Sequence, residues 1–251
     1  MADTPPTPAD GASAPPGRPA LCWVDGCLAG EGWMAKVAGM AQSGMQVRFR
    51  PAAPDDAAVA VPLIYASGPD SFDYVFTTRD GGDALAFLQH CYADGAGEFG
   101  WRNHWVGVAD GRVVAVGAGY GAQTKWPFTL AAARQIISHY GLRRGLAVIA
   151  RGLRVESVIR PPDGDMHYLA HLAVLPELRG LGVGHALIDH LIGLARDAGR
   201  RRITLDVAAS NPRAEALYLR TGFRVTVERK SQLASECGRV VDHRRMERVL
   251  D

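Results

Sequence analysis

Residues 172–184 constrain the fold of this chain more than any other stretch, because they combine the end of a strand, a turn and the Gly-rich start of a helix. Residues 168–174 are nearly all apolar, and Pro176 ends the predicted strand because proline cannot donate a hydrogen bond to a neighbouring strand. Within residues 183–198 apolar side chains recur every three or four positions, which predicts a helix with one buried face. Gly199 is suited to end that helix.

The predicted turn contains Gly180, Gly182 and Gly184. Glycines let a ligand approach the backbone, and the free N–H groups at a helix start favour an anion, so the pattern predicts a phosphate-binding loop. It is not a Walker A loop, because His185 stands where that motif has lysine. A dinucleotide fingerprint would need glycine at the same position, although Asp206 lies where a ribose-binding acid is expected. A nucleotide-dependent oxidoreductase therefore stays open as a weaker alternative.

The pattern that fits without change is Arg179-x-x-Gly182-x-Gly184, and here the sequence resembles the acyl-CoA-binding motif of the GNAT superfamily of N-acetyltransferases. The resemblance implies that backbone N–H groups of the loop hold the pyrophosphate of CoA. It also implies that the preceding strand splays open to pair with the pantetheine arm. The residues so implied in acetyl-CoA binding are Ala173, Val174, Arg179, Gly180, Leu181, Gly182, Val183 and Gly184, with Asn211 and Tyr218.

A second, shorter helix carries a full set of end signals. Asn211 is a good N-cap, Pro212 suits the first helical position, and Gly222 suits the position after the last turn. Asn211 and Tyr218 are seven residues apart, so two turns place them on one face. The string Asn-x-x-Ala-x-x-Leu-Tyr-x-x-x-Gly-Phe resembles the second GNAT signature, which implies that the Asn position contacts the pantetheine arm and that the Tyr hydroxyl meets the CoA sulfur.

The resemblance covers about residues 45–251, most specifically 166–223, and implies the GNAT fold. That fold is α/β (α+β), with a mixed, mostly antiparallel central sheet that is splayed at the CoA site and flanked by helices. Two apolar runs around Asp110-Gly111 predict a β-hairpin. The other predicted elements are a strand at 47–50, helices at 55–67, 71–76 and 84–92, strands at 203–207, 224–230 and 240–249, and a helical insertion at about 120–153.

The predicted insertion is placed to shape the acceptor pocket, since helices bordering the central strand do so in the family. Tyr120, Trp126 and His139 are its candidate pocket residues, and the alternative is that they only pack within the insertion. Residues 1–44 are predicted to be a flexible Pro/Ala-rich extension, because the first 20 residues contain almost no large apolar side chains.

Composition restricts the class of protein. With 47% hydrophobic residues, a net charge of +2 and no apolar run of 18 residues, the 251-residue chain is expected to be soluble and to bind neither nucleic acid nor membrane. Its four cysteines have no paired spacing and predict free thiols in a reducing compartment, so a cytoplasmic location is expected. A homodimer is a further expectation.

Acetyl transfer to an amine needs a proton donor for the leaving thiolate and hydrogen-bond donors for the thioester oxygen. Tyr218 suits the first role, since a phenol with a pKa of about 10 stays protonated at neutral pH. Backbone N–H groups near Ala173 and Val174 suit the second. None of the cysteines falls in either motif, which favours direct transfer in a ternary complex over an acyl-cysteine intermediate.

The base that accepts the amine proton is harder to predict. Tyr168 and His171 are the candidates on the central strand, and strand alternation places His171 on the face of His167, opposite Tyr168. The resemblance implies that the face of Tyr168 and Ala170 looks into the acceptor site, which leaves His171 against the helices unless a bulge disturbs the alternation. Glu156 is a further acid upstream, with weaker placement.

A metal site is not expected. His185, Asp189 and His190 lack a pair of histidines on one helix face, so solvated positions are predicted for them. The sequence thus predicts an acyl-CoA-dependent N-acetyltransferase with acetyl-CoA as cosubstrate and a primary amine of a small molecule, peptide or protein as acceptor. The alternative is a non-catalytic acyl-CoA-binding sensor or partner module on the same fold.

Overall fold

The computed structural model describes Trp33, Val37 and residues 46–79 and 81–250. The chain divides into two compact units, residues 1–42 and residues 43–251. The predicted extension lies outside the described residues apart from Trp33 and Val37, which are helical. The second unit contains all the other described elements.

Seven strands form one sheet in the described part of the chain, in the order β1-β2-β3-β4-β5-β7-β6. Only β4 and β5 run parallel, so the prediction of a mixed, mostly antiparallel sheet is confirmed. The strands are β1 (Arg48–Pro51), β2 (His104–Ala109), β3 (Arg112–Gly121), β4 (Met166–Val174), β5 (Arg202–Ala208), β6 (Arg224–Arg229) and β7 (His243–Val249). The helices are α3 (Ala57–Ala66), α4 (Pro69–Phe76), α5 (Ala84–Asp94), α6 (Lys125–Val155), α7 (Val183–Asp197) and α8 (Pro212–Arg220).

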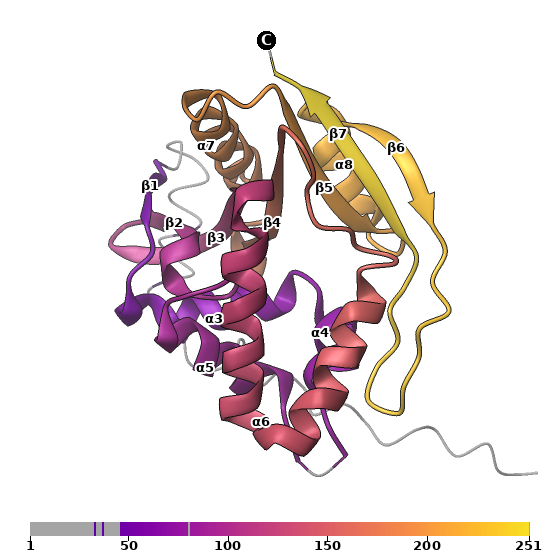
Figure 1. The fold of residues 1–251 in the computed structure, drawn as a ribbon. Helices are drawn as coiled ribbons and strands as arrows, with labels where there is room; N and C mark the ends of the chain where they lie inside the picture. The colour runs from indigo at the N-terminus through magenta and orange to yellow at the C-terminus, as the bar shows by residue number, and fades with distance from the viewer. Residues whose placement is uncertain (1–32, 34–36, 38–45, 80, 251) are drawn as a thin grey trace, which may run out of the picture. The chain divides into compact units, whose positions relative to one another are not determined.

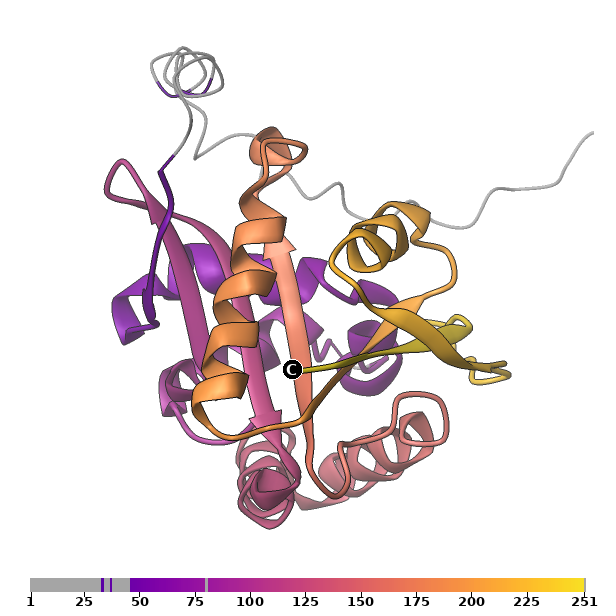
Figure 2. The same cartoon turned by 90° about the horizontal axis from the view of Figure 1, so that it is seen from above.

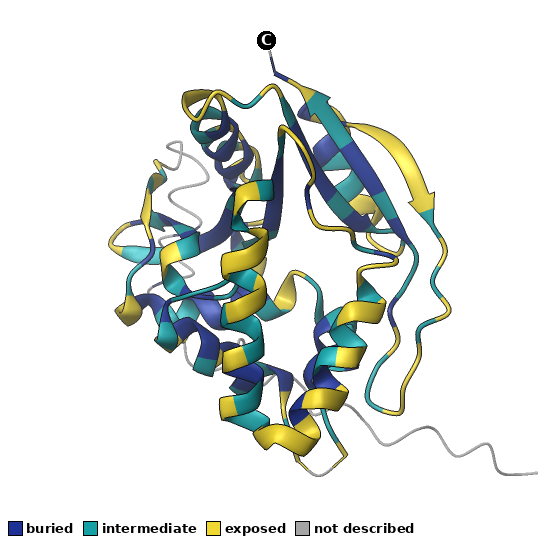
Figure 3. Ribbon diagram, viewed as in Figure 1, coloured by how far each residue is buried: buried dark blue, intermediate teal, exposed yellow. Residues whose placement is uncertain are grey.

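Helices cover both faces of the central strands (Figures 1 and 2). α3 and α7 pack on opposite faces of β3 and β4. The apolar face predicted for α7 is buried, and Gly117 of β3 lets the helix approach, since a Cβ there would lie 3.0 Å from the Leu191 side chain. Buried positions line the sheet and the inward helix faces, while the outer faces are exposed (Figure 3).

α6 occupies the region predicted as a helical insertion, and it consists of two arms. Gly141 has φ 74° and ψ 168°, a conformation outside the helical region that divides the helix. Glycine adopts this positive φ without the strain a Cβ would cause. The second arm turns back toward the start of β4, as Figure 1 shows, and α6 packs against α4 and α5.

β4 and β5 pair at their first residues and then separate, which confirms the predicted splay. Their pairing is limited to Met166 with Arg202, His167 with Ile203 and Tyr168 with Thr204. Beyond Tyr168 the two strands have no registered partners in each other, although β4 continues to Val174. The C-terminal half of β4 therefore has one edge without a neighbouring strand.

A β-bulge in β4 overturns the predicted orientation of His171. Ala118 of β3 pairs with Ala170 and Val116 pairs with Ala173, so His171 and Leu172 together oppose the single residue Gly117. His171 adopts φ 55°, in the left-handed region that non-glycine residues rarely enter. The extra residue shifts the alternation, so His171 lies on the side of Tyr168 and not against α7.

Candidate active site

A cavity of about 410 Å³ lies between α4, α6 and the middle of β4. Side chains with ionisable or hydroxyl groups reach it from separate parts of the chain. Glu98 comes from the loop after α5, Tyr168 and His171 from β4, and Tyr218 from α8. The fold therefore brings the predicted acid and both predicted strand candidates to one cavity.

The loop before α7 has the open backbone that its sequence predicts. Gly180 and Gly182 have φ values of 85° and 86°, and a Cβ at either position would meet nothing within 4 Å. The first hydrogen bond of α7 runs from the Ala186 N–H to the Gly182 carbonyl at 3.0 Å. The N–H groups of Val183, Gly184 and His185 thus have no acceptor within the helix, and this end of α7 suits an anion.

The unpaired edge of β4 presents one of the two predicted backbone donors. Leu175 donates its N–H to the Val114 carbonyl at 3.0 Å, and Val174 pairs with Ala115. Antiparallel alternation then directs the Val174 N–H away from β3 and the Ala173 N–H toward it. Val174 fits the predicted role, whereas the Ala173 N–H is engaged in the ladder, which corrects that part of the prediction. The Val174 carbonyl accepts a hydrogen bond from the exposed Arg179 Nε at 3.3 Å.

α8 forms as its end signals predict. The Asn211 side chain accepts a hydrogen bond from the Ala214 N–H at 3.1 Å, so Asn211 is the N-cap. Gly184 lets α7 pack near α8, since a Cβ there would lie 3.2 Å from the Leu217 side chain. The adjacent Tyr218 lines the cavity, and among the described residues no protein group hydrogen-bonds to its hydroxyl. Burial raises the pKa of Tyr218 to about 12, so the phenol keeps its proton.

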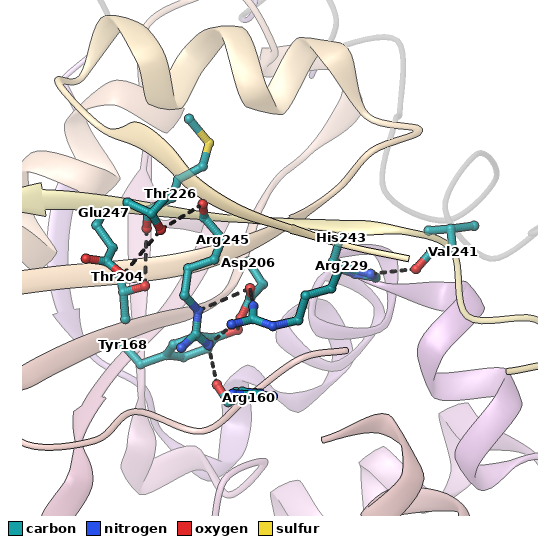
Figure 4. Close-up of polar contacts among 11 residues, drawn as sticks. Arg160, Tyr168, Thr204, Asp206, Thr226, Arg229, Val241, His243, Arg245 and Glu247 are labelled. Carbon is teal, nitrogen blue, oxygen red and sulfur yellow. Dashed lines mark hydrogen bonds and ion pairs between the residues drawn. The ribbon is translucent and has the colours of Figure 1, made fainter. Parts of the chain in front are cut away.

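The Tyr168 hydroxyl is committed to an ionic network that includes Asp206 and Arg245 (Figure 4). It donates to Asp206 at 3.1 Å, and Asp206 is paired with Arg245 at 2.7 Å. Burial and the nearby Asp206 carboxylate raise the pKa of Tyr168 well above 10. Tyr168 therefore contributes its ring to the cavity wall, and its hydroxyl is poorly suited to accept a proton.

The contact between His171 and the buried His104 fixes the proton positions of His171. His104 Nδ1 lies 2.9 Å from the Gly100 carbonyl, which only accepts, so Nδ1 carries the proton. Burial lowers the pKa of His104 to about 4, and the ring is neutral with a lone pair on Nε2. His171 Nδ1, 3.0 Å from that atom, must then be the donor. Burial and the neighbouring His104 also lower the pKa of His171, so its Nε2 holds a free lone pair, 3.7 Å from Glu98.

The comparison with known families agrees with this geometry. The family described as Acetyltransferase (GNAT) matches residues 83–223, more than half of the chain. The chain belongs to the GNAT family. The match includes the splayed strand, the Gly-rich loop and the helix that carries Tyr218.

Relatives of this GNAT chain are N-acetyltransferases by name. The 5-NmdU N-acetyltransferase of Pseudomonas phage PaMx11 is 33% identical over 93 residues, which are 37% of this chain and 58% of that protein. The [Ribosomal protein bS18]-alanine N-acetyltransferase of Escherichia coli K12 is 37% identical over 75 residues, 30% of this chain and 51% of that protein. The chain thus spans just over half the length of these curated relatives.

The solved structures confirm the GNAT fold. An N-acetyltransferase from Staphylococcus aureus Mu50 superposes with a TM-score of 0.58 at 16% identity, covering 80% of this chain and all of that one. Within the part of this GNAT chain that the structure describes, no helix combines the length and apolar character needed to cross a membrane.

One of the helix positions predicted to be solvated is packed instead. His190 is half-buried and packs its ring against Phe49 and Trp105 at centroid distances of 4.9 and 4.7 Å, so it is not solvated as predicted. His185 lies on the surface, 3.2 Å from Asp189. Among the described residues, no group of three His, Cys, Asp or Glu side chains could hold a metal ion.

Of the three candidate pocket residues in the predicted insertion, one lines the cavity and two do not. Tyr120 lines the cavity, whereas Trp126 is 72% exposed and His139 packs against Phe87. Sequence reasoning missed Glu98 and His104, which lie far from both motifs.

Proposed function

We propose that this GNAT protein transfers the acetyl group of acetyl-CoA to a primary amine by direct attack within a ternary complex. The observation that supports this most strongly is the convergence of Tyr218 and His171 on one cavity, beside the unpaired edge of β4. The open Gly-rich loop at the end of that edge fits the pyrophosphate of CoA, and the Val174 N–H fits the thioester carbonyl oxygen. Bound acetyl-CoA supplies the acetyl group as a thioester.

His171 acts as the general base in this proposal. Its Nε2 lone pair is held toward the cavity by the hydrogen bond from Nδ1 to His104, which makes His104 a positioning residue. An alkylammonium ion loses two protons when it becomes an amide. His171 passes one of these protons to solvent. The sulfur of the leaving group gains one proton, which accounts for the second. The new carbon–nitrogen bond forms as the carbon–sulfur bond breaks.

Tyr218 acts as the general acid that protonates the departing sulfur. Tyr218 lines the cavity, its hydroxyl has no protein partner among the described residues, and its raised pKa keeps it protonated. A positioned acid or base contributes roughly 100-fold to 10,000-fold to a rate. We therefore expect Tyr218→Phe to reduce turnover by about 100-fold or more while acetyl-CoA binding persists.

The test measures acetyl-CoA binding by calorimetry and amine-dependent release of free thiol. Gly182→Trp should abolish acetyl-CoA binding, because φ 86° disfavours a side chain and the indole would fill the loop. Gly193→Trp is the matched control on α7, where a Cβ meets nothing within 4 Å. Tyr65→Phe controls for loss of a phenol, since the Tyr65 hydroxyl bonds Asp73 outside the cavity. Absence of acetyl-CoA binding would refute the proposal, and binding without turnover over a broad amine panel would favour the sensor.

A further inference from the structure

We infer that the acceptor is a compact primary amine with an apolar body, aromatic or branched aliphatic, whose ammonium group binds Glu98. This inference rests on the proposed function and names the substrate class for the same site. It follows from the volume of the cavity, the chemistry of its walls and the position of its acidic groups.

The two arms of α6 form part of the cavity wall. The first arm contributes Ala133 and Ile136, and the second contributes Ile149 and Gly152. α4 packs against α6 and supplies another wall. A volume of about 410 Å³ lies at the low end of the range for small-ligand sites. An extended peptide would instead need an open groove or a sheet edge along its length.

An aromatic group that packs against His171 of β4 forms part of the cavity wall. Phe72 meets Phe99 edge to face at 5.7 Å, and Phe76 meets Phe99 in the same way at 5.8 Å. All three rings line the cavity, together with Val75 and Ile159. An apolar acceptor body gains free energy when it is buried here, whereas a hydrophilic acceptor such as a polyamine would leave its additional polar groups without partners.

The charges around the cavity favour a cation at Glu98. Glu98 and Glu156 both line it, and no Lys or Arg pairs with either among the described residues. Asp206 is already paired with Arg245, and Arg160 is exposed at the rim. His171 and His243 are neutral, since burial lowers the pKa of both. The other titratable groups on the wall are the hydroxyls of Tyr120, Tyr168 and Tyr218.

Glu98 also has the position that the reaction requires. Its Oε1 accepts a hydrogen bond from the Tyr120 hydroxyl at 2.8 Å, which fixes the carboxyl group. The same oxygen lies 3.7 Å from His171 Nε2, so an ammonium group bound to Glu98 is adjacent to the base. Burial and the nearby Glu156 raise the pKa of Glu98, because both disfavour the ionised carboxylate. A bound cation would stabilise that carboxylate.

In the experiment the protein receives acetyl-CoA together with phenethylamine, isopentylamine, spermidine or a peptide that begins with alanine. The release of free thiol is then measured. Calorimetry of each amine with the CoA-loaded protein measures binding without turnover. Ala133→Trp fills the cavity from the first arm of α6, and Leu130→Trp, at a 69% exposed position on the same arm, is the matched control. Glu98→Gln removes the charge and keeps the shape of the side chain.

We expect the two apolar amines to bind and react. Glu98→Gln should raise their KM by about tenfold or more, as loss of a charged hydrogen bond predicts. Ala133→Trp should abolish amine binding with acetyl-CoA affinity unchanged, and Leu130→Trp should match the wild type. Turnover of spermidine or the peptide in preference to the apolar amines would overturn the inference and leave the proposed function intact. Acetyl-CoA binding with no binding of either apolar amine would also overturn it. Loss of acetyl-CoA binding itself would instead refute the proposed function.

Discussion

Two histidines of β4 show how the backbone of a single residue decides its chemistry. His167 keeps the extended strand conformation, and its ring packs over Gly119 away from the cavity. His171, four residues later, adopts φ 55° and reaches Glu98. Strand alternation could not predict this difference, because the bulge depends on the pairing of β4 with Gly117 of β3.

His167 carries a prediction for stability at acid pH. Burial and the nearby Arg200 guanidinium lower the pKa of His167 to about 4, from an ordinary 6.5. Between these values the unfolded chain binds a proton that the folded chain does not, so stability falls as pH falls through this window. His167→Leu should remove about 1.5 kcal/mol of the loss in unfolding free energy between pH 6.5 and pH 5.

Urea titrations of wild type and His167→Leu at several pH values measure this effect. His185→Leu is the control, because the His185 side chain is exposed and half of its surface meets solvent. Equal slopes of stability against pH for wild type and His167→Leu would mean that His167 does not titrate with folding.

The candidate site could be predicted from sequence only where short motifs carry it. Tyr218 and the glycines at 180 and 182 stand within such patterns. In the structure Tyr218 lines the cavity and both glycines have positive φ. Glu98 and His104 are placed by contacts between residues distant in sequence, with His104 meeting a residue 67 positions away. The one local signal for Glu98 was its place in a Gly-rich loop, which many surface turns share.

At the scale of elements, α8 depends on its N-cap. The Asn211 side chain accepts from the Ala214 N–H, and Arg244 holds Glu215 of the same helix at 2.7 Å. Asn211→Ala should lower the unfolding free energy by about 1 kcal/mol, because one N–H of the first turn loses its acceptor. Asn211→Asp retains the acceptor and should stay near the wild-type value. Urea unfolding followed by circular dichroism measures both, and an unchanged Asn211→Ala midpoint would show that the cap contributes nothing.

The regular elements were predictable because their periodicity and end signals are local. The apolar face of α7, the hairpin of β2 and β3 and the short α8 all agree with their patterns. The two arms of α6 were harder to predict, since their angle comes from one glycine at 141 and from packing against α4 and α5. Both arms line the cavity, so this part of its wall is the least visible in sequence.

At the scale of the whole molecule, the sheet order determines which residues meet. β4 and β5 pair over three positions and then separate, so one strand edge is left beside the loop of α7. β7 lies between β5 and β6 and carries Arg245 to Asp206, which anchors Tyr168 under the cavity. Tyr218 of α8 and His171 of β4 reach the cavity from different elements of this fold.

All of these elements belong to residues 43–251, which form one of the two compact units. We therefore expect a chain of residues 45–251 to fold and to bind acetyl-CoA with unchanged affinity. Its midpoint of thermal unfolding should lie within about 2 °C of the full-length value, which for a protein of this size corresponds to less than about 1 kcal/mol. Calorimetry of unfolding and of acetyl-CoA binding, on both chains at equal concentration, provides the comparison. An aggregated or unfolded shorter chain would show that the first 44 residues complete the fold, and an intact fold with weakened binding would assign them to the site.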